Sequence, residues 1–300
     1  MPLRGPAVFL ALALLAAPSA RAQFADAVTA TPITGPLWML TGAGDVITAS
    51  VGPDGILLVD NGFPQTVDSV RAALRRLSGS AVPQVIVNSH WHHTGANEAF
   101  AAEAMIIAHA RTRDRLREGA LMYTRPMPAR EAAAFPDLVL ADSLSLWFNG
   151  ERVDLLYLPA SHTDTDLAVL FTGSRVAALG DLFVPFIPVT DYGSGGDLYA
   201  SVRAVERLLD RLDPTWKIVP GHGRLSTYED LRGFHGMLKG MIAHVEQAID
   251  AGRTMEQVVA GGIPAAWQSW MGDLLTPEFV LQNFYEGVRR VPRDRRLTTP

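Results

Sequence analysis

The amino-acid sequence predicts an α/β fold in which helices pack against β-sheet. Strand-like apolar runs alternate with helix-like segments in both halves of the chain. Loops that carry histidine or aspartate directly follow several of these runs. Because binding and catalytic sites in such folds lie where loops leave the carboxyl ends of strands, these loops are predicted to form the functional site.

Short apolar runs bounded by turn residues predict the strands. Gly52-Pro53-Asp54-Gly55 is typical of a tight turn, and Asn149-Gly150 of a hairpin turn. The predicted strands cover residues 37–40, 46–51, 56–59, 85–87, 105–108, 138–140, 143–148, 152–158, 167–171, 175–179 and 216–219.

Helical periodicity predicts the helices. Apolar residues recur at helical spacing over residues 66–77. From Leu198 onward helices dominate, and Ser226-x-x-Glu229 is typical of a capping box that opens a long helix ending before Gly252. The stretch rich in proline and alanine, residues 126–136, is predicted to be a surface loop.

The first 22 residues have the layout of a secretory signal peptide. Arg4 gives a positive start, an apolar run follows, and Ala20-Arg21-Ala22 is a small-x-small cleavage site. The alternative is a membrane anchor, but about 20 apolar residues are needed to span a bilayer and this run is shorter. We therefore expect a signal peptide over residues 1–22, one further domain over residues 23–300, no membrane span after cleavage, and a periplasmic or secreted protein.

Composition narrows the chemistry of the predicted mature chain. Without Arg4 and Arg21 it carries 24 basic and 31 acidic side chains, a net formal charge of −7. No basic stripe is visible, so nucleic acid is not expected as a partner. The sequence contains no cysteine, which excludes thiolate metal sites and cysteine nucleophiles.

Three histidines lie within four residues, in the segment Ser89-His90-Trp91-His92-His93. In an extended loop, residues i and i+2 project to the same side, so His90 and His92 can converge on one ion. Imidazole nitrogen suits zinc, and a catalytic zinc needs three protein ligands and an open position. The alternative interpretation is a surface histidine patch or a tag-like run.

Three more candidate ligands follow strand-like runs. His162 lies in Ser161-His162-Thr163-Asp164, Asp181 in Gly180-Asp181, and His222 in Pro220-Gly221-His222-Gly223. Each motif alone is weak, but together they place one acid and three histidine loops at strand ends.

This order of motifs resembles the metallo-β-lactamase superfamily over nearly all of the mature chain. The resemblance implies an αββα sandwich of two mixed β-sheets flanked by helices, with zinc between them. It implies that His90, His92 and His162 hold a first zinc, that His222 helps to hold a second, and that Asp181 bridges the two. Asp60, in Leu58-Val59-Asp60-Asn61-Gly62, would be a group that orients a ligand.

The histidine loop departs from the family pattern His-x-His-x-Asp-His. Read in register, Thr94 and Gly95 stand where the aspartate and the third histidine belong. Read with a gap of two residues, His93-Thr94-Gly95-Ala96-Asn97 matches the end of the pattern, and we prefer this alignment. His93 is then the third histidine, while the aspartate ligand is missing. One zinc is expected, and a second is doubtful.

The predicted function is hydrolysis of a carbonyl-containing small molecule (an ester, thioester, lactone or amide) by a metal-bound hydroxide. A β-lactam is the minority alternative for the substrate. The competing hypothesis is a non-catalytic binding protein with an incomplete metal site. The sequence indicates neither the oligomeric state nor the exact substrate.

Overall fold

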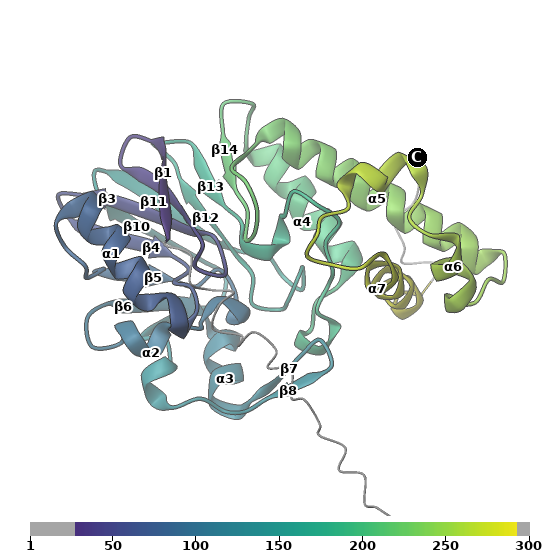
Figure 1. Ribbon diagram of the computed structural model, residues 1–300, viewed down its shortest axis with the longest axis horizontal. Helices are drawn as coiled ribbons and strands as arrows, with labels where there is room; N and C mark the ends of the chain where they lie inside the picture. The colour runs from purple at the N-terminus through teal and green to yellow at the C-terminus, as the bar shows by residue number, and fades with distance from the viewer. Residues whose placement is uncertain (1–27, 293–300) are drawn as a thin grey trace, which may run out of the picture.

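The computed structural model describes residues 28–292, so the predicted signal peptide lies outside the described residues. Two β-sheets face each other and helices cover both outer surfaces (Figure 1). This arrangement confirms the predicted αββα sandwich. No helix within residues 28–292 is both long and apolar enough to cross a bilayer.

The first sheet has seven strands and mixed pairing. Strands β1 to β4 are antiparallel neighbours, whereas β4, β5, β6 and β9 run parallel. In spatial order the strands are β1 (Thr29–Thr34), β2 (Leu37–Thr41), β3 (Ile47–Gly52), β4 (Gly55–Val59), β5 (Val85–Val87), β6 (Met105–His109) and β9 (Leu138–Leu140).

The second sheet has six strands, and only the pair β13–β14 is parallel. In spatial order the strands are β10 (Ser143–Phe148), β11 (Glu151–Tyr157), β12 (Leu167–Phe171), β13 (Val176–Ala178), β14 (Lys217–Val219) and β15 (Ser226–Thr227). A separate hairpin pairs β7 (Ala120–Met122) with β8 (Arg125–Met127).

Alternating side chains on the strands build three cores. Leu57 and Val59 of β4 face Val169 and Phe171 of β12 between the sheets. The intervening Leu58 packs on the outer face of the first sheet, against α1 and α2. Because successive side chains on a strand point to opposite faces, a continuous apolar run supplies both layers.

The helices lie outside the sheets, and the C-terminal ones extend beyond the sandwich (Figure 1). Helices α4, α5 and α7 share the largest apolar cluster with the outer face of the second sheet. The helices are α1 (Val67–Ser78), α2 (Asn97–Phe100), α3 (Ala110–Glu118), α4 (Leu198–Arg211), α5 (Tyr228–Asp250), α6 (Met255–Gly261) and α7 (Pro277–Arg290).

The structure corrects some local predictions. The capping box of α5 is formed by Thr227 and Asp230, one residue later than the predicted Ser226 and Glu229, because the helix begins at Tyr228. The predicted surface loop over residues 126–136 begins inside strand β8. Strand β1, helix α3 and the hairpin lacked a clear period in the sequence and were missed.

The parallel strands end level with one another and so place their loops at one rim. Val59 pairs with Val87 in the first sheet, and Ala178 pairs with Val219 in the second. The loops that follow these four residues carry all but one of the predicted ligands. The last, His162, lies in the turn between β11 and β12.

Candidate metal centre

The histidine loop is fixed to the first sheet through Asp60, the residue after β4. Asp60 has a positive φ of 65°, so the chain leaves the strand direction there. Its two carboxylate oxygens accept hydrogen bonds from the backbone N–H and the hydroxyl of Ser89, each at 2.7 Å. The Ser89 hydroxyl also lies 3.1 Å from Nδ1 of His90. These contacts fix the start of the loop.

A short 3₁₀ turn, Trp91–His93, then separates the neighbouring histidines. His90 precedes the turn in extended conformation. Because a 3₁₀ helix has three residues per turn, adjacent side chains in it point in different directions. His92 and His93 can therefore contribute to different clusters although they are consecutive.

The structure brings the predicted ligands together in two clusters. One consists of His90, His92, His162 and Asp181, and its ligand atoms all lie within 4.8 Å of one another. The other consists of His93, Asp181 and His222 and meets the same limit. All six predicted metal ligands thus lie in one place, and Asp181 belongs to both clusters.

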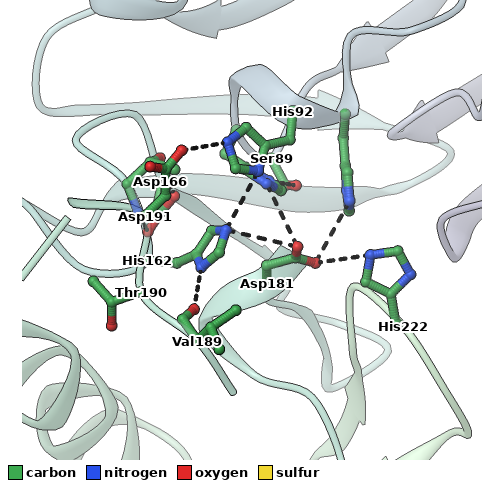
Figure 2. Close-up of polar contacts among 12 residues, drawn as sticks. Ser89, His92, His162, Asp166, Asp181, Val189, Thr190, Asp191 and His222 are labelled. Carbon is green, nitrogen blue, oxygen red and sulfur yellow. Dashed lines mark hydrogen bonds and ion pairs between the residues drawn. The ribbon is translucent and has the colours of Figure 1, made fainter. Parts of the chain in front are cut away.

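Asp181 faces each cluster with a different carboxylate oxygen (Figure 2). Its Oδ2 atom lies 3.7 Å from Nε2 of both His90 and His162. Its Oδ1 atom lies 3.5 Å from Nε2 of both His93 and His222. This is the arrangement expected of a carboxylate that bridges two ions.

Gly221 allows the close approach of the two loops that carry Asp181 and His222. A Cβ atom on Gly221 would lie 2.0 Å from Oδ1 of Asp181, so only glycine fits beside the carboxylate. The backbone N–H of Gly221 donates to the carbonyl of Gly180 at 2.8 Å and ties the loops together.

Partners behind the rings select the nitrogen that each histidine presents. Nδ1 of His162 lies 2.9 Å from the carbonyl oxygen of Val189, and Nε2 of His92 lies 2.9 Å from Oδ2 of Asp191 (Figure 2). Nε2 of His162 and Nδ1 of His92 are left to face each other at 3.4 Å. Groups of this kind orient metal-binding imidazoles.

The donor set fits a metal ion. Within the described part of the chain, Nε2 of His90 and Oδ1 of Asp181 are buried and have no hydrogen-bond partner. Leaving such groups unpaired costs free energy, so their presence at the centre of the two clusters indicates a binding site for a cation. Imidazole nitrogens and a carboxylate are ligands that suit zinc.

Burial and charge set the protonation of the histidines. Burial lowers the pKa of His90 well below its ordinary value and that of His92 to about 4, so both rings are neutral and can bind a cation. Burial would also lower the pKa of His93, but the carboxylates of Asp181 and Asp60 and a third carboxylate raise it to about 10. An ion that binds the second cluster must therefore displace a proton from His93, whereas His90 and His92 of the first cluster carry no such proton.

Sequence reasoning missed that third carboxylate, Asp45. Asp45 precedes β3 and is buried; its Oδ2 atom lies 3.8 Å from Nδ1 of His93, and its Oδ1 atom has no partner within residues 28–292. Burial raises the pKa of Asp45 to about 6. Nothing in the sequence connects Asp45 with the histidine loop, because it comes from a loop 48 positions before His93.

Asp191 was also missed, because nothing near it in the sequence resembles a motif. Besides His92, it accepts hydrogen bonds at Oδ1 from the backbone N–H groups of Tyr123 and Ser194, at 2.8 and 3.1 Å. Asp191 therefore connects the hairpin turn after β7 to the first cluster.

A small cavity of about 90 Å³ opens onto both clusters. His162, Asp181 and His222 line it together with Tyr123, and apolar side chains such as Leu274 form the rest of its wall. The ring of Tyr123 lies 5.7 Å from that of His92 and 6.3 Å from that of His162, between centroids. Burial raises the pKa of Tyr123, so its phenol stays protonated.

Comparison with solved structures identifies the fold, whereas sequence comparison identifies nothing. No family model matches the chain, and no curated protein matches it either. A stereoselective inverting sec-alkylsulfatase from Pseudomonas sp. superimposes with a TM-score of 0.69 and 14% identity, over 86% of this chain and 50% of that one. This chain thus spans half the length of the sulfatase.

Two metallo-β-lactamases match over nearly their whole length. The enzyme from Pontibacter korlensis gives a TM-score of 0.56 and 19% identity, covering 71% of this chain and 99% of that one. The enzyme from Hirschia baltica gives 0.56 and 18%, covering 71% and 98%. The chain therefore has the metallo-β-lactamase fold, as the order of its motifs predicted.

Proposed function

We propose that this protein is a metal-dependent hydrolase of carbonyl-containing small molecules, with zinc as the metal. The observation that carries the proposal is Asp181, whose two oxygens each face a pair of imidazole nitrogens beside a cavity. Zinc in such a site activates water near neutral pH and polarises a carbonyl group. The bond cleaved is an ester, thioester, lactone or amide.

The two clusters hold their ions unequally. The first offers three histidines and a share of Asp181, whereas the second offers two histidines and the other share. The aspartate missing from the histidine loop would have been a further ligand of the second cluster. One ion is therefore bound tightly and a second more weakly.

The chain's own groups position the reaction. Asp60, Asp191 and the Val189 carbonyl fix the rings of His93, His92 and His162. Tyr123, protonated and lining the cavity, donates a hydrogen bond to the substrate oxygen on which negative charge develops.

Two further substrate classes belong in the same test. Two of the structures compared above are named as metallo-β-lactamases and one as an alkylsulfatase, so a β-lactam or a sulfate ester is an alternative substrate of the same centre. The layout of residues 1–22 supports export to the periplasm or the medium, where such substrates would be met.

The second candidate function is non-catalytic binding. The shortened histidine loop favours it, because a ligand of the second cluster is absent. Against it, the remaining six ligands are all brought together, with oriented rings and a buried carboxylate. A binding protein without catalysis has no need of that arrangement.

Metal analysis combined with a hydrolysis screen tests the proposal. Purified protein should contain zinc and hydrolyse p-nitrophenyl acetate, nitrocefin or p-nitrophenyl sulfate. Asp181→Asn should lose most of both metal and activity, whereas Asp210→Asn, on the exposed face of α4, should retain both. Metal binding without any hydrolysis would favour the non-catalytic alternative, and absence of metal would contradict the proposal.

A further inference from the structure

A second, larger cavity shares the lining residue Tyr123 with the small cavity at the metal centre. It measures about 840 Å³, which lies within the usual range for small-molecule sites. The turn of the β7–β8 hairpin, the segment around Tyr192 and one face of α7 line it. Tyr123 lines both cavities, so it stands between the candidate metal centre and the larger space.

Aromatic contacts continue across this boundary. The ring of Tyr123 lies 5.7 Å from that of His92 on one side and 6.0 Å from that of Phe279 on the other. Phe279 is the first residue of α7 to line the larger cavity. Aromatic rings therefore connect the candidate metal ligand His92 with the start of α7.

Exposed apolar side chains gather at these two cavities. Seven large hydrophobic side chains are exposed within residues 28–292, and three of them line one cavity or the other. These are Leu121, Leu274 and Phe279, which are 45, 65 and 39% exposed. Apolar surface left in water beside a site is typical of a binding surface for apolar ligands.

The charge of the lining changes along α7. Phe279, Gln282, Glu286 and Arg290 follow at spacings of three or four residues and so share one face of the helix. At about 1.5 Å of rise per residue, this face extends roughly 16 Å. Among residues 28–292, the charged side chains that line the cavity are Glu286 and Arg290, which lie at the end away from Phe279. The part nearest the metal centre is neutral.

We infer that the larger cavity holds the apolar chain of an acyl substrate whose carbonyl group lies at the metal centre. The inference rests on the proposed function and names its substrate class: esters, thioesters or lactones of medium-chain acids. Because the bonds of a hydrocarbon chain zigzag, an extended chain of about ten carbons reaches roughly 11 Å, which is about the distance along α7 from Phe279 to Glu286. In hydrolysis the acyl C–O or C–S bond breaks, the oxygen of water joins the acyl carbon, and the leaving alcohol or thiol takes a proton.

Chain-length dependence tests the inference. The kinetics of p-nitrophenyl esters from acetate to decanoate should show KM falling roughly two- to fourfold per methylene, because each buried methylene adds apolar contact. Acetate and decanoate differ by eight methylenes, so even a twofold change per methylene makes the decanoate-to-acetate ratio of kcat/KM about 250 in the wild-type protein. A flat profile across the series would contradict the inference.

A matched pair of variants on α7 locates the effect. Gln282→Trp places an indole ring in the cavity next to Phe279, where it obstructs the path along α7, and should lower that ratio at least tenfold. Arg289→Trp places the same side chain on an exposed position of the same helix that does not line the cavity, and should keep the ratio. Equal loss of the ratio in both variants would overturn the assignment to this cavity.

Binding without turnover separates this inference from the proposed function. Calorimetric titration with 1-octanol should give saturable binding to the wild-type protein and to Arg289→Trp, and at least tenfold weaker binding to Gln282→Trp. If no ester is hydrolysed but octanol binds in this pattern, the proposed function fails and the cavity assignment stands. If esters of every length are hydrolysed equally and octanol does not bind, the hydrolase stands and the acyl cavity does not.

Discussion

Oδ2 of Asp60 lies 2.9 Å from Nδ1 of His93. This contact leaves Nε2 of the same ring to face Asp181. Asp60, which directly follows β4, therefore orients a ligand that belongs to the histidine loop after β5. In this way Asp60 turns His93 toward Asp181 although His93 directly follows His92 in the chain.

Asp60→Asn should weaken the second metal site more than the first. The amide can still accept from Ser89, but it replaces a charged acceptor for His93, and loss of such an orienting group costs about 10- to 100-fold in metal affinity. Competition with a chelator measures both dissociation constants. Asp68→Asn, at an exposed position of α1, is the control. Unchanged affinity at both sites would show that Asp60 does not orient His93.

His162→Ala should abolish tight binding at the first site. The remaining ligands are His90, His92 and a share of Asp181, which is no more than the two histidines and shared carboxylate of the weaker second cluster. Zinc content after dialysis against a weak chelator measures the loss, and circular dichroism checks the fold. His244→Ala, on α5 and in neither cluster, should keep full content. Equal zinc in the two variants would refute the ligand set.

Much of this centre follows from local sequence, and the exceptions have a physical cause. His90, His162, Asp181 and His222 were identified because each follows a strand-like run, and strand ends meet at one rim. The αββα layers were predicted through the family resemblance that the order of the motifs carries. Asp45 and Asp191 were not identifiable, because Asp45 contacts a histidine about fifty positions away in the chain and Asp191 contacts one about a hundred positions away.

The spacing of the histidines also did not indicate the backbone conformation of the loop that carries them. His90 and His92 fall in one cluster, but through a 3₁₀ turn and not through the extended loop from which their convergence was predicted. The spacing does not predict the 3₁₀ turn that rotates His93 away from its neighbour. Hairpin β7–β8 is equally hidden, because its strands have three residues each and one contains Pro126.

The second ion should bind with release of a proton. Burial opposes protonation of His93, but Asp181, Asp60 and Asp45 raise its pKa to about 10, so the ring is protonated at neutral pH in the metal-free protein. A cation must displace that proton, and the affinity of the second site should rise about tenfold per pH unit between pH 7 and 9. Titrations in buffers of different ionisation enthalpy measure the proton. An affinity independent of pH would contradict this protonation state.

Tyr123→Phe should lower kcat roughly tenfold with little change in KM, because it removes one hydrogen bond to charge that develops in the transition state. The backbone contact of Tyr123 with Asp191 is unaffected by the substitution. Steady-state kinetics on the best ester substrate measure the effect. Tyr228→Phe, which loses only a hydrogen bond to the Leu209 carbonyl, is the control. An equal decrease in the two variants would assign Tyr123 a structural role alone.

Zinc titration of the metal-free wild-type protein tests most directly whether Asp181 joins two unequal metal sites. Isothermal titration should show one tightly bound ion followed by a second that binds at least tenfold more weakly, for a total of two per chain. The reason is that the second cluster has one histidine fewer than the first and shares the same carboxylate. An isotherm without binding, or with two ions of equal affinity, would contradict this assignment of the ligands.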